Sequence, residues 1–291
     1  MKVALLHAGK GAPGTNAFVL RLYELLSDNG HELLLVPEGF KGLTEGTFTR
    51  PDAGLLKRLR NEPLPVLKPA PYEGFKKLES RERAYRVLKK EGVDALVVLG
   101  GRGATEASLL IAEESGTPVL TVPFTVEADL SLTDEHGGFS SFTEELFARL
   151  NALVRRARSS GGRYLFKLGL NAPRALLKAA VAAGVDGLHL PGRTSVEKLK
   201  RLESFVLASL GSPPLELPFT AVEQGDYGLI YARVTARDLE LAVLFARVVF
   251  ESLVAGESSG FVAVERRRFY LEQFERVLKE PPLENELLKE L

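Results

Sequence analysis

Short apolar runs alternate with longer amphipathic stretches along this chain, and this alternation restricts the possible folds more than any other feature. The apolar runs predict strands at 2–7, 31–37, 94–100, 117–123, 163–169, 186–192, 227–234 and 260–265. The stretches between them predict helices at 15–29, 80–91, 104–115, 141–158, 173–183 and 235–255, most of which end at a glycine. Strands that alternate with helices through short loops predict an α/β fold with mainly parallel sheets.

The length of the chain is sufficient for two lobes of this kind. Of its 291 residues, 45% are hydrophobic, which is enough to bury a sizeable core. We place the boundary between the lobes near 131–138, with a return of the chain near 235–240. The proline-rich segment 51–74 is predicted to be a long irregular surface loop.

The charge balance and the residue usage exclude several classes of function. Lys and Arg number 38, as do Asp and Glu, so the net charge of zero gives no electrostatic reason to expect binding to nucleic acid or to a membrane surface. The chain has no cysteine and only four scattered histidines, so neither thiolate chemistry nor a histidine-rich metal site is expected. The N-terminal apolar run is too short for a signal peptide, which predicts a soluble, cytoplasmic protein. The scarcity of Cys, Trp and Met indicates a thermophilic source.

Three loops follow predicted strands and carry the residues typical of an anion site. In open parallel sheets, ligands bind beyond the carboxyl ends of the strands, where helix N-termini favour anions. The loops are "HAGKGAPGTN" (7–16), "GGRGATE" (100–106) and "PFTVEAD" (123–129). Their candidate ligand-binding residues are Gly9, Lys10, Gly11, Gly100, Gly101, Arg102 and Gly103, and the third loop adds the acids Glu127 and Asp129. Together they predict a site for phosphate and phosphoryl transfer, although a plain tight turn is an equal alternative for either glycine loop taken alone.

The order of these loops resembles that of the ATP-dependent 6-phosphofructokinase family, nearly from end to end. "HAGKGAPGTNA" is similar to the family's S-G-G-D-A-P-G-M-N-A loop, and "GFKGL" (39–43) is similar to its G-Y-x-G-L. The stretch 95–134 follows the family's pattern through G-G-D-G and T-I-D-N-D, and the last helix, strand and helix also match. The resemblance implies two Rossmann-like lobes with the active-site cleft between them. These are a larger nucleotide-binding lobe (1–132 plus 237–291) and a smaller sugar-phosphate lobe (133–236).

The resemblance also implies an activity and partners. The family phosphorylates fructose 6-phosphate with ATP in glycolysis, usually as a homotetramer. A sugar phosphate, a nucleotide or another phosphorylated metabolite is therefore the expected ligand, and a homo-oligomer (dimer or tetramer) is the expected assembly. Phe40, at the tyrosine of the G-Y-x-G-L motif, joins the candidate nucleotide-binding residues on this ground.

Several positions depart from the family's pattern on the nucleotide and metal side. Arg102 stands where the family has the acid that helps hold magnesium, and Glu127 stands where it has the catalytic aspartate. Ala128 replaces the asparagine of T-I-D-N-D, whereas Thr125 and Asp129 are retained. The resemblance thus implies Thr125, Glu127 and Asp129 as the candidate catalytic residues. The arginine of the nucleotide side aligns with Pro71.

The sugar-phosphate side is also depleted. The family's M-G-R-H-A-G arginine falls on Leu170 or Asn171, and Arg174 comes one turn later. Gly192 stands at the sugar-binding glutamate, and the H-V-Q-R-G-G loop has no counterpart in "IYARVTARD" (230–238).

These departures leave three interpretations of the function. The first is a degenerate family member, catalytically impaired, that binds an anionic metabolite without magnesium or regulates an intact phosphofructokinase in a hetero-oligomer. The second is an active 6-phosphofructokinase or related sugar kinase with ATP as cosubstrate and Glu127 as base. The third, kinship with NAD kinases and lipid kinases, is disfavoured by the "APGTN" and "PFTVEAD" segments. For Arg102 itself, contact with a phosphate and an ion pair with Glu127 or Asp129 are the alternatives.

Overall fold

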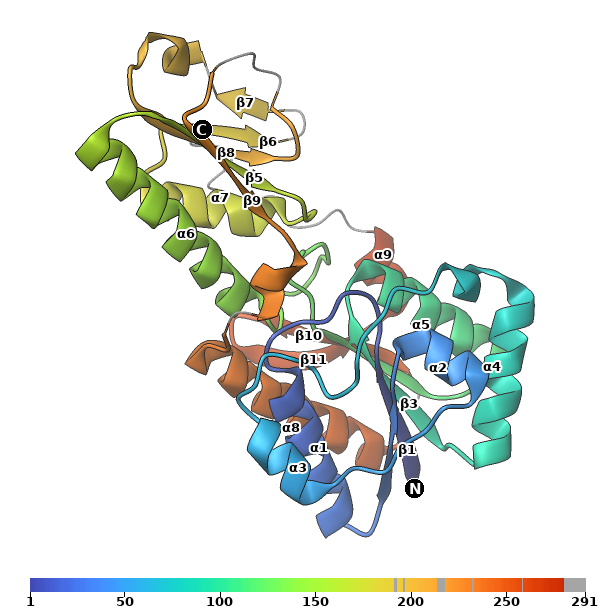
Figure 1. Cartoon of the computed structure of the whole chain (residues 1–291). Helices are drawn as coiled ribbons and strands as arrows, with labels where there is room; N and C mark the ends of the chain where they lie inside the picture. Colours follow the sequence, from blue (N-terminus) through green and yellow to red (C-terminus); the bar gives the residue numbers. More distant parts are fainter. Residues whose placement is uncertain (191–192, 196, 214–217, 232, 258, 280–291) are drawn as a thin grey trace. The chain divides into compact units, whose positions relative to one another are not determined.

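The computed structural model describes residues 1–190, 193–195, 197–213, 218–231, 233–257 and 259–279 (Figure 1). Contacts between residues divide this part of the chain into two units. The first contains Met1–Thr125, Asp129–Gly138 and the described residues of 234–279, and the second contains Val126–Ala128 and Phe139–Arg233. The lobe boundaries at 132 and 237, and the cleft between the lobes, stay predictions.

The first unit is built on a sheet of six strands in the order β11-β10-β4-β3-β1-β2. Five of these strands run parallel, and only β11 is antiparallel to its neighbour. Their bounds are Lys2–His7 (β1), Glu32–Val36 (β2), Ala95–Gly100 (β3), Val119–Pro123 (β4), Gly260–Glu265 (β10) and Arg268–Glu272 (β11). The strands β1, β3, β4 and β10 are almost entirely buried, as their continuous apolar sequences predict.

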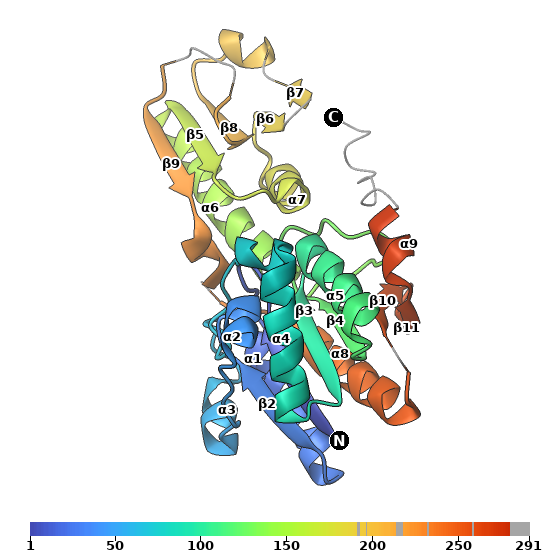
Figure 2. The same ribbon diagram turned by 90° about the vertical axis from the view of Figure 1, so that its right-hand side faces the viewer.

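Helices cover both faces of this sheet (Figures 1 and 2). One face is covered by α1 (Thr15–Asp28) and α8 (Ala236–Ala255), which pack on each other, with α3 (Ala53–Leu59) beside α1. The other face is covered by α2 (Gly39–Glu45), α4 (Leu78–Glu91), α5 (Arg102–Ser115) and α9 (Phe274–Lys279). Alternate strand residues such as Leu6 and Val98 point into the core under this second group, because successive side chains of a strand face opposite sides.

The second unit is a smaller α/β layer pair. Its sheet has the order β7-β6-β8-β5-β9, and every pairing is parallel except that of β7 with β6. The strands are Arg163–Leu168 (β5), Gly187–Leu190 (β6), Arg193–Ser195 (β7), Phe205–Leu210 (β8) and Ala221–Gly225 (β9). Helices α6 (Phe139–Ser160) and α7 (Pro173–Ala183) pack together on it, and the 3₁₀ helices η2 (Glu197–Arg201) and η3 (Tyr227–Tyr231) complete the unit. The predicted α/β class with mainly parallel sheets is confirmed.

Two of the sequence predictions about local structure are wrong. The run at 227–234 does not begin as a strand but as the 3₁₀ helix η3, because Asp226 accepts hydrogen bonds from the backbone N–H groups of Gly228 and Leu229 and starts a tight turn. The segment 51–74 is not wholly irregular. It contains α3, whose first turn is capped by Asp52, and its end enters the 3₁₀ helix η1 (Glu73–Lys76).

Strands β7, β8, β9 and β11 lie outside the predicted set. The strand predicted at 186–192 is observed as β6, and Pro191 and Gly192 lie outside the described residues. Among the described helices, none is long and apolar enough to cross a membrane.

Candidate active site

The sheet order brings the three candidate loops together at one edge. Strands β1, β3 and β4 are consecutive neighbours and run parallel, with Leu6 beside Val98 and Val98 beside Thr121. Their carboxyl ends, and the loops that follow them, therefore lie side by side. The loops that sequence motifs single out as ligand-binding thus share the edge where open α/β sheets bind ligands.

The first loop is a tightly turned segment that depends on its glycines. Gly9, Gly11 and Gly14 have φ angles of 82°, 81° and 87°, in the left-handed region that side chains with a Cβ rarely adopt. The Thr15 hydroxyl donates a hydrogen bond to the Ala12 carbonyl at 2.7 Å and ties the end of the loop to α1. Lys10 is half-buried between two of these glycines.

The second and third loops approach each other closely at Gly101. A Cβ on Gly101 would lie 2.9 Å from Asp129 Oδ1 and 3.1 Å from Thr125 Oγ1, so only glycine fits there without movement. By contrast, a Cβ on Gly103 would meet no atom within 4 Å. The structure thus brings Gly101, Thr125 and Asp129 together, as a common site requires, and leaves open space beside Gly103.

Arg102 is the first residue of α5, and its guanidinium contacts residues of its own unit. Nη2 donates a hydrogen bond to the Leu278 carbonyl of α9 at 2.6 Å, and Nε lies 3.3 Å from Glu106 Oε1, one turn along α5. The side chain is 37% exposed. These are the partners that the structure gives Arg102 within its own unit, and the predicted alternative of an ion pair with Glu127 or Asp129 stays a prediction.

Glu127 lies in a turn whose backbone is strained. Its neighbour Ala128 has a φ of 50°, a conformation that costs an alanine about 1–2 kcal/mol. Arg174, in the first turn of α7, donates a hydrogen bond from Nη1 to the Ala128 carbonyl at 3.1 Å. Its guanidinium also lies 6.0 Å from the centre of the Phe139 ring, a ring that Lys178 approaches at 5.2 Å. Glu127 is thus half-buried in a turn that Arg174 holds through the Ala128 carbonyl. In the sequence, Arg174 comes one turn after the position where the motif has its arginine.

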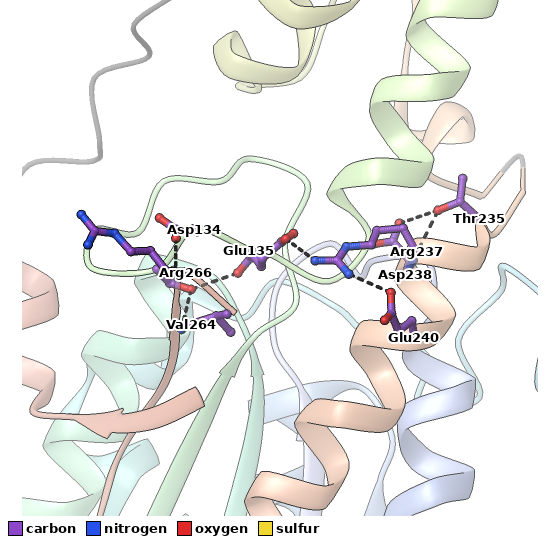
Figure 3. A network of polar contacts seen from close by, with 9 residues as sticks. Asp134, Glu135, Thr235, Arg237, Asp238, Glu240, Val264 and Arg266 are labelled. Carbon is purple, nitrogen blue, oxygen red and sulfur yellow. Dashed lines mark hydrogen bonds and ion pairs between the residues drawn. The ribbon is translucent and has the colours of Figure 1, made fainter. Parts of the chain in front are cut away.

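A polar network fixes the far end of the loop that follows β4 (Figure 3). Arg237 of α8 contacts both Glu135 and Glu240, and Asp134 accepts a hydrogen bond from the backbone of Arg266 at 2.8 Å. The backbone of Asp134 in turn donates to the Val264 carbonyl at 2.7 Å. The segment that carries Asp129 is therefore anchored to both α8 and the β10–β11 hairpin.

His7, the last residue of β1, is fully buried between the first and third loops. Its Nδ1 is 3.1 Å from Thr15 Oγ1, and its Nε2 is 3.3 Å from the Phe124 carbonyl. Burial lowers the pKa of His7 from 6.5 to about 4, partly opposed by the hydrogen bond to Phe124. The imidazole is thus neutral at pH 7, and in the tautomer with the proton on Nε2 it donates to the Phe124 carbonyl. Its position at the end of β1 is the only sequence signal of this role.

The structure also gives the surroundings of Phe40 and of several positions that depart from the motif pattern. The Phe40 ring is buried in the core beneath α2, with its centre 4.3 Å from that of Phe75, so in this structure it is a packing residue and its predicted contact with a nucleotide stays a prediction. Leu170 is buried, whereas Pro71 and Asn171 are exposed. Gly192 lies outside the described residues. Within the described part of the chain, no three His, Asp or Glu side chains form a group that could hold a metal ion.

This protein has two mainly parallel α/β units, and the first carries glycine-bearing loops at the carboxyl edge of its sheet. These features are typical of the class of α/β proteins that bind ligands at that edge. Within this class, a family model described as Phosphofructokinase matches residues 2–199, and the chain belongs to this family. The resemblance inferred from the sequence motifs is thereby confirmed.

Relatives of known name match along the whole chain. The ATP-dependent 6-phosphofructokinase of Aquifex aeolicus (strain VF5) is 30% identical, over 99% of this chain and 98% of its own length. That of Thermotoga neapolitana is 26% identical, over 92% of this chain and 91% of its own length.

Solved structures show the same fold at lower identity. A phosphofructokinase of Pichia pastoris in the T-state superposes with a TM-score of 0.81 at 16% identity, over 95% of this chain. A pyrophosphate-dependent phosphofructokinase of Nitrosospira multiformis superposes with a TM-score of 0.78 at 17% identity, over 98% of this chain and 86% of its own. This chain spans only 35% of the Pichia chain.

Proposed function

We propose that this protein binds a phosphorylated metabolite at its two glycine loops and that its magnesium-dependent phosphoryl transfer is impaired. One observation carries the proposal: Arg102, a permanent cation, opens α5 at the position where the family's loop has an acid on the metal side. The N-terminus of this 14-residue helix favours an anion, and Lys10 on the neighbouring loop adds a positive charge. The open space beside Gly103 leaves room for a ligand. A sugar phosphate or a nucleotide such as ATP has the required charge.

The residues of the second loop do not fit the magnesium ion that the family implies. A guanidinium at the position of a coordinating carboxylate repels a divalent cation and offers it no lone pair. The same guanidinium binds phosphate oxygens well, because its planar donors match them in pairs. The change from acid to arginine therefore favours an anion site that needs no metal.

The remaining chemical groups are consistent with impaired transfer. Glu127 retains a carboxylate at the position of the family's base but carries it one methylene further out, whereas catalytic groups must be placed within about 0.5 Å. On the sugar-phosphate side, the buried Leu170 offers no charge to a second phosphate. Each charged contact of a phosphoryl-transfer site contributes about 3–4 kcal/mol, so the combined losses remove much of the rate enhancement.

A second candidate function is an active 6-phosphofructokinase in which Glu127 is the base. It is favoured by the retention of Thr125 and Asp129, which lie against Gly101, and by the carboxylate that Glu127 keeps at the position of the base. The names of the full-length relatives also favour it.

A regulatory role extends the first proposal to partners. A chain that binds the family's ligands with little turnover is suited to act as a subunit beside an intact phosphofructokinase. We expect a homo-oligomer, a dimer or a tetramer, when it is purified alone, and a hetero-oligomer when the intact enzyme is present. A cytoplasmic location and a thermophilic source belong to the same proposal.

Calorimetry with inorganic phosphate in the absence of magnesium tests the anion site. We expect binding by the wild-type protein and at least tenfold weaker binding by Arg102→Asp. Arg86→Asp, the same charge change on the exposed face of α4, is the matched control and should bind like the wild type. Equal affinity in the wild type and in Arg102→Asp would refute the role of Arg102.

A further inference from the structure

Arg102 lies at the N-terminus of one helix, and its side chain reaches the C-terminal turn of another. Its backbone is at the N-terminus of α5, where the helix dipole disfavours a cation. Its side chain reaches the last turn of α9, where carbonyl groups lack partners within the helix and a cation is favoured. The 2.6 Å hydrogen bond to the Leu278 carbonyl is thus the contact that stabilises the guanidinium in this position.

A second donor fastens the same turn of α9. The Ser131 hydroxyl, from the loop that follows β4, is buried and donates a hydrogen bond to the Val277 carbonyl at 2.7 Å. Val277 and Phe274 are themselves buried in the core cluster that includes Ala104 of α5. Two consecutive carbonyls of α9 are therefore held by a donor from the second candidate loop and a donor from the segment that follows the third loop.

We propose that Arg102 is a latch that holds α9 against the second glycine loop, and that an anion bound at this loop releases it. The inference rests on the anion site proposed above. The edge of the guanidinium formed by Nε and Nη2 is occupied by Glu106 and by the Leu278 carbonyl. This edge is one of those that bind a phosphate through two parallel hydrogen bonds to one group, whereas a carbonyl accepts only one of the two. Among the described residues, a phosphate that takes this edge leaves Ser131 as the remaining side-chain donor to the two carbonyls of α9.

The two donors allow the latch to be separated from the anion site. Ser131→Ala removes one fastening of α9 and leaves Arg102 intact, whereas Arg102→Gln removes both the latch and the charge. Both variants should accelerate hydrogen exchange in 274–279 by about threefold or more, since each leaves a carbonyl of α9 without its donor. Their affinities for inorganic phosphate should change in opposite directions. Ser131→Ala should bind about two- to fivefold more tightly, because the competing contact is weakened, and Arg102→Gln at least tenfold more weakly.

The deciding experiment measures hydrogen exchange of 274–279 in the full-length protein, with and without inorganic phosphate, together with phosphate affinity by calorimetry. Phosphate should accelerate exchange in the wild type and have no effect in Arg102→Gln. Arg102→Lys keeps the charge without the paired edge and should bind phosphate with intermediate affinity, which guards against a variant that fails to fold. Phosphate binding by the wild type without any change in exchange, or unaltered affinity in Ser131→Ala, would overturn the latch. If the wild type binds no phosphate, both the anion site and its competition with α9 for Arg102 are refuted. The exchange rates of the two variants still show whether Arg102 and Ser131 hold α9 in place.

Discussion

Protonation of His7 should make the stability of this protein depend on pH between about 4 and 6.5. The imidazole is fully buried, and its pKa is lowered to about 4, whereas in the unfolded chain it returns to about 6.5. Above pH 6.5 both states are neutral at this position, and the stability is complete. As the pH falls below 6.5, the unfolded chain takes up a proton that the folded protein does not, so unfolding becomes more favourable. Over the interval from 6.5 to 4, at about 1.4 kcal/mol per pH unit, the loss amounts to about 3 kcal/mol.

Urea denaturation at pH 7.5, 6.5, 5.5 and 4.5 measures this loss, with His7→Gln as the comparison. Glutamine places its amide near the position of Nε2 and can donate to the Phe124 carbonyl, but it does not titrate. Carboxylates contribute equally to both proteins, so the difference between their stabilities isolates His7. We expect this difference to narrow as the pH falls, by about 2–3 kcal/mol between pH 7.5 and 4.5. Parallel curves for the two proteins would refute a neutral buried His7 with a lowered pKa.

Three further predictions concern the stability of loops and a helix in the same protein. Gly101→Ala should lower the free energy of unfolding by about 1–3 kcal/mol, because its Cβ would press on Thr125 and Asp129. The control Gly103→Ala, whose Cβ would meet no atom, should not lower it. Urea denaturation of both variants tests this difference. Ala128→Gly should raise the free energy of unfolding by about 1 kcal/mol, since glycine relieves the left-handed backbone, and an unchanged or lower value would count against strain in this turn. Asp52→Ala should lower stability by about 1 kcal/mol through loss of the cap on α3, and equal denaturation midpoints would show that this helix does not depend on its cap.

The parts of the fold with simple sequence patterns could be predicted, and those that depend on distant contacts could not. Strands β1, β3 and β4 are continuous apolar runs that end at loops with glycine or proline, and buried parallel strands have this pattern. The run at 227–231 is also apolar but forms a 3₁₀ helix, because Asp226 starts a tight turn there. Leu229 and Ile230 are buried within this turn rather than in a strand. Periodicity alone does not separate these two cases.

The candidate site shows the same limit. That the three loops share an edge follows from parallel strands, and the motifs identify the residues on them. The partner of Arg102 does not follow, because α9 is 176 residues away along the chain and returns to the second loop only in the folded protein. The contact of Arg174 with Ala128 is similarly hidden, since the left-handed turn at Ala128 has no signal in a sequence where alanine replaces asparagine.

The central claim is that phosphoryl transfer is impaired while an anion site remains. Its most direct test is a coupled assay of ADP production with fructose 6-phosphate, ATP and magnesium, run beside the Aquifex aeolicus relative under identical conditions. Loss of even one charged contact in such a site costs about 10²–10³ in rate, so we predict turnover at least about 10³-fold below that of the relative. Turnover within tenfold of the relative would contradict the claim and establish the protein as an active 6-phosphofructokinase with Glu127 in place of the aspartate.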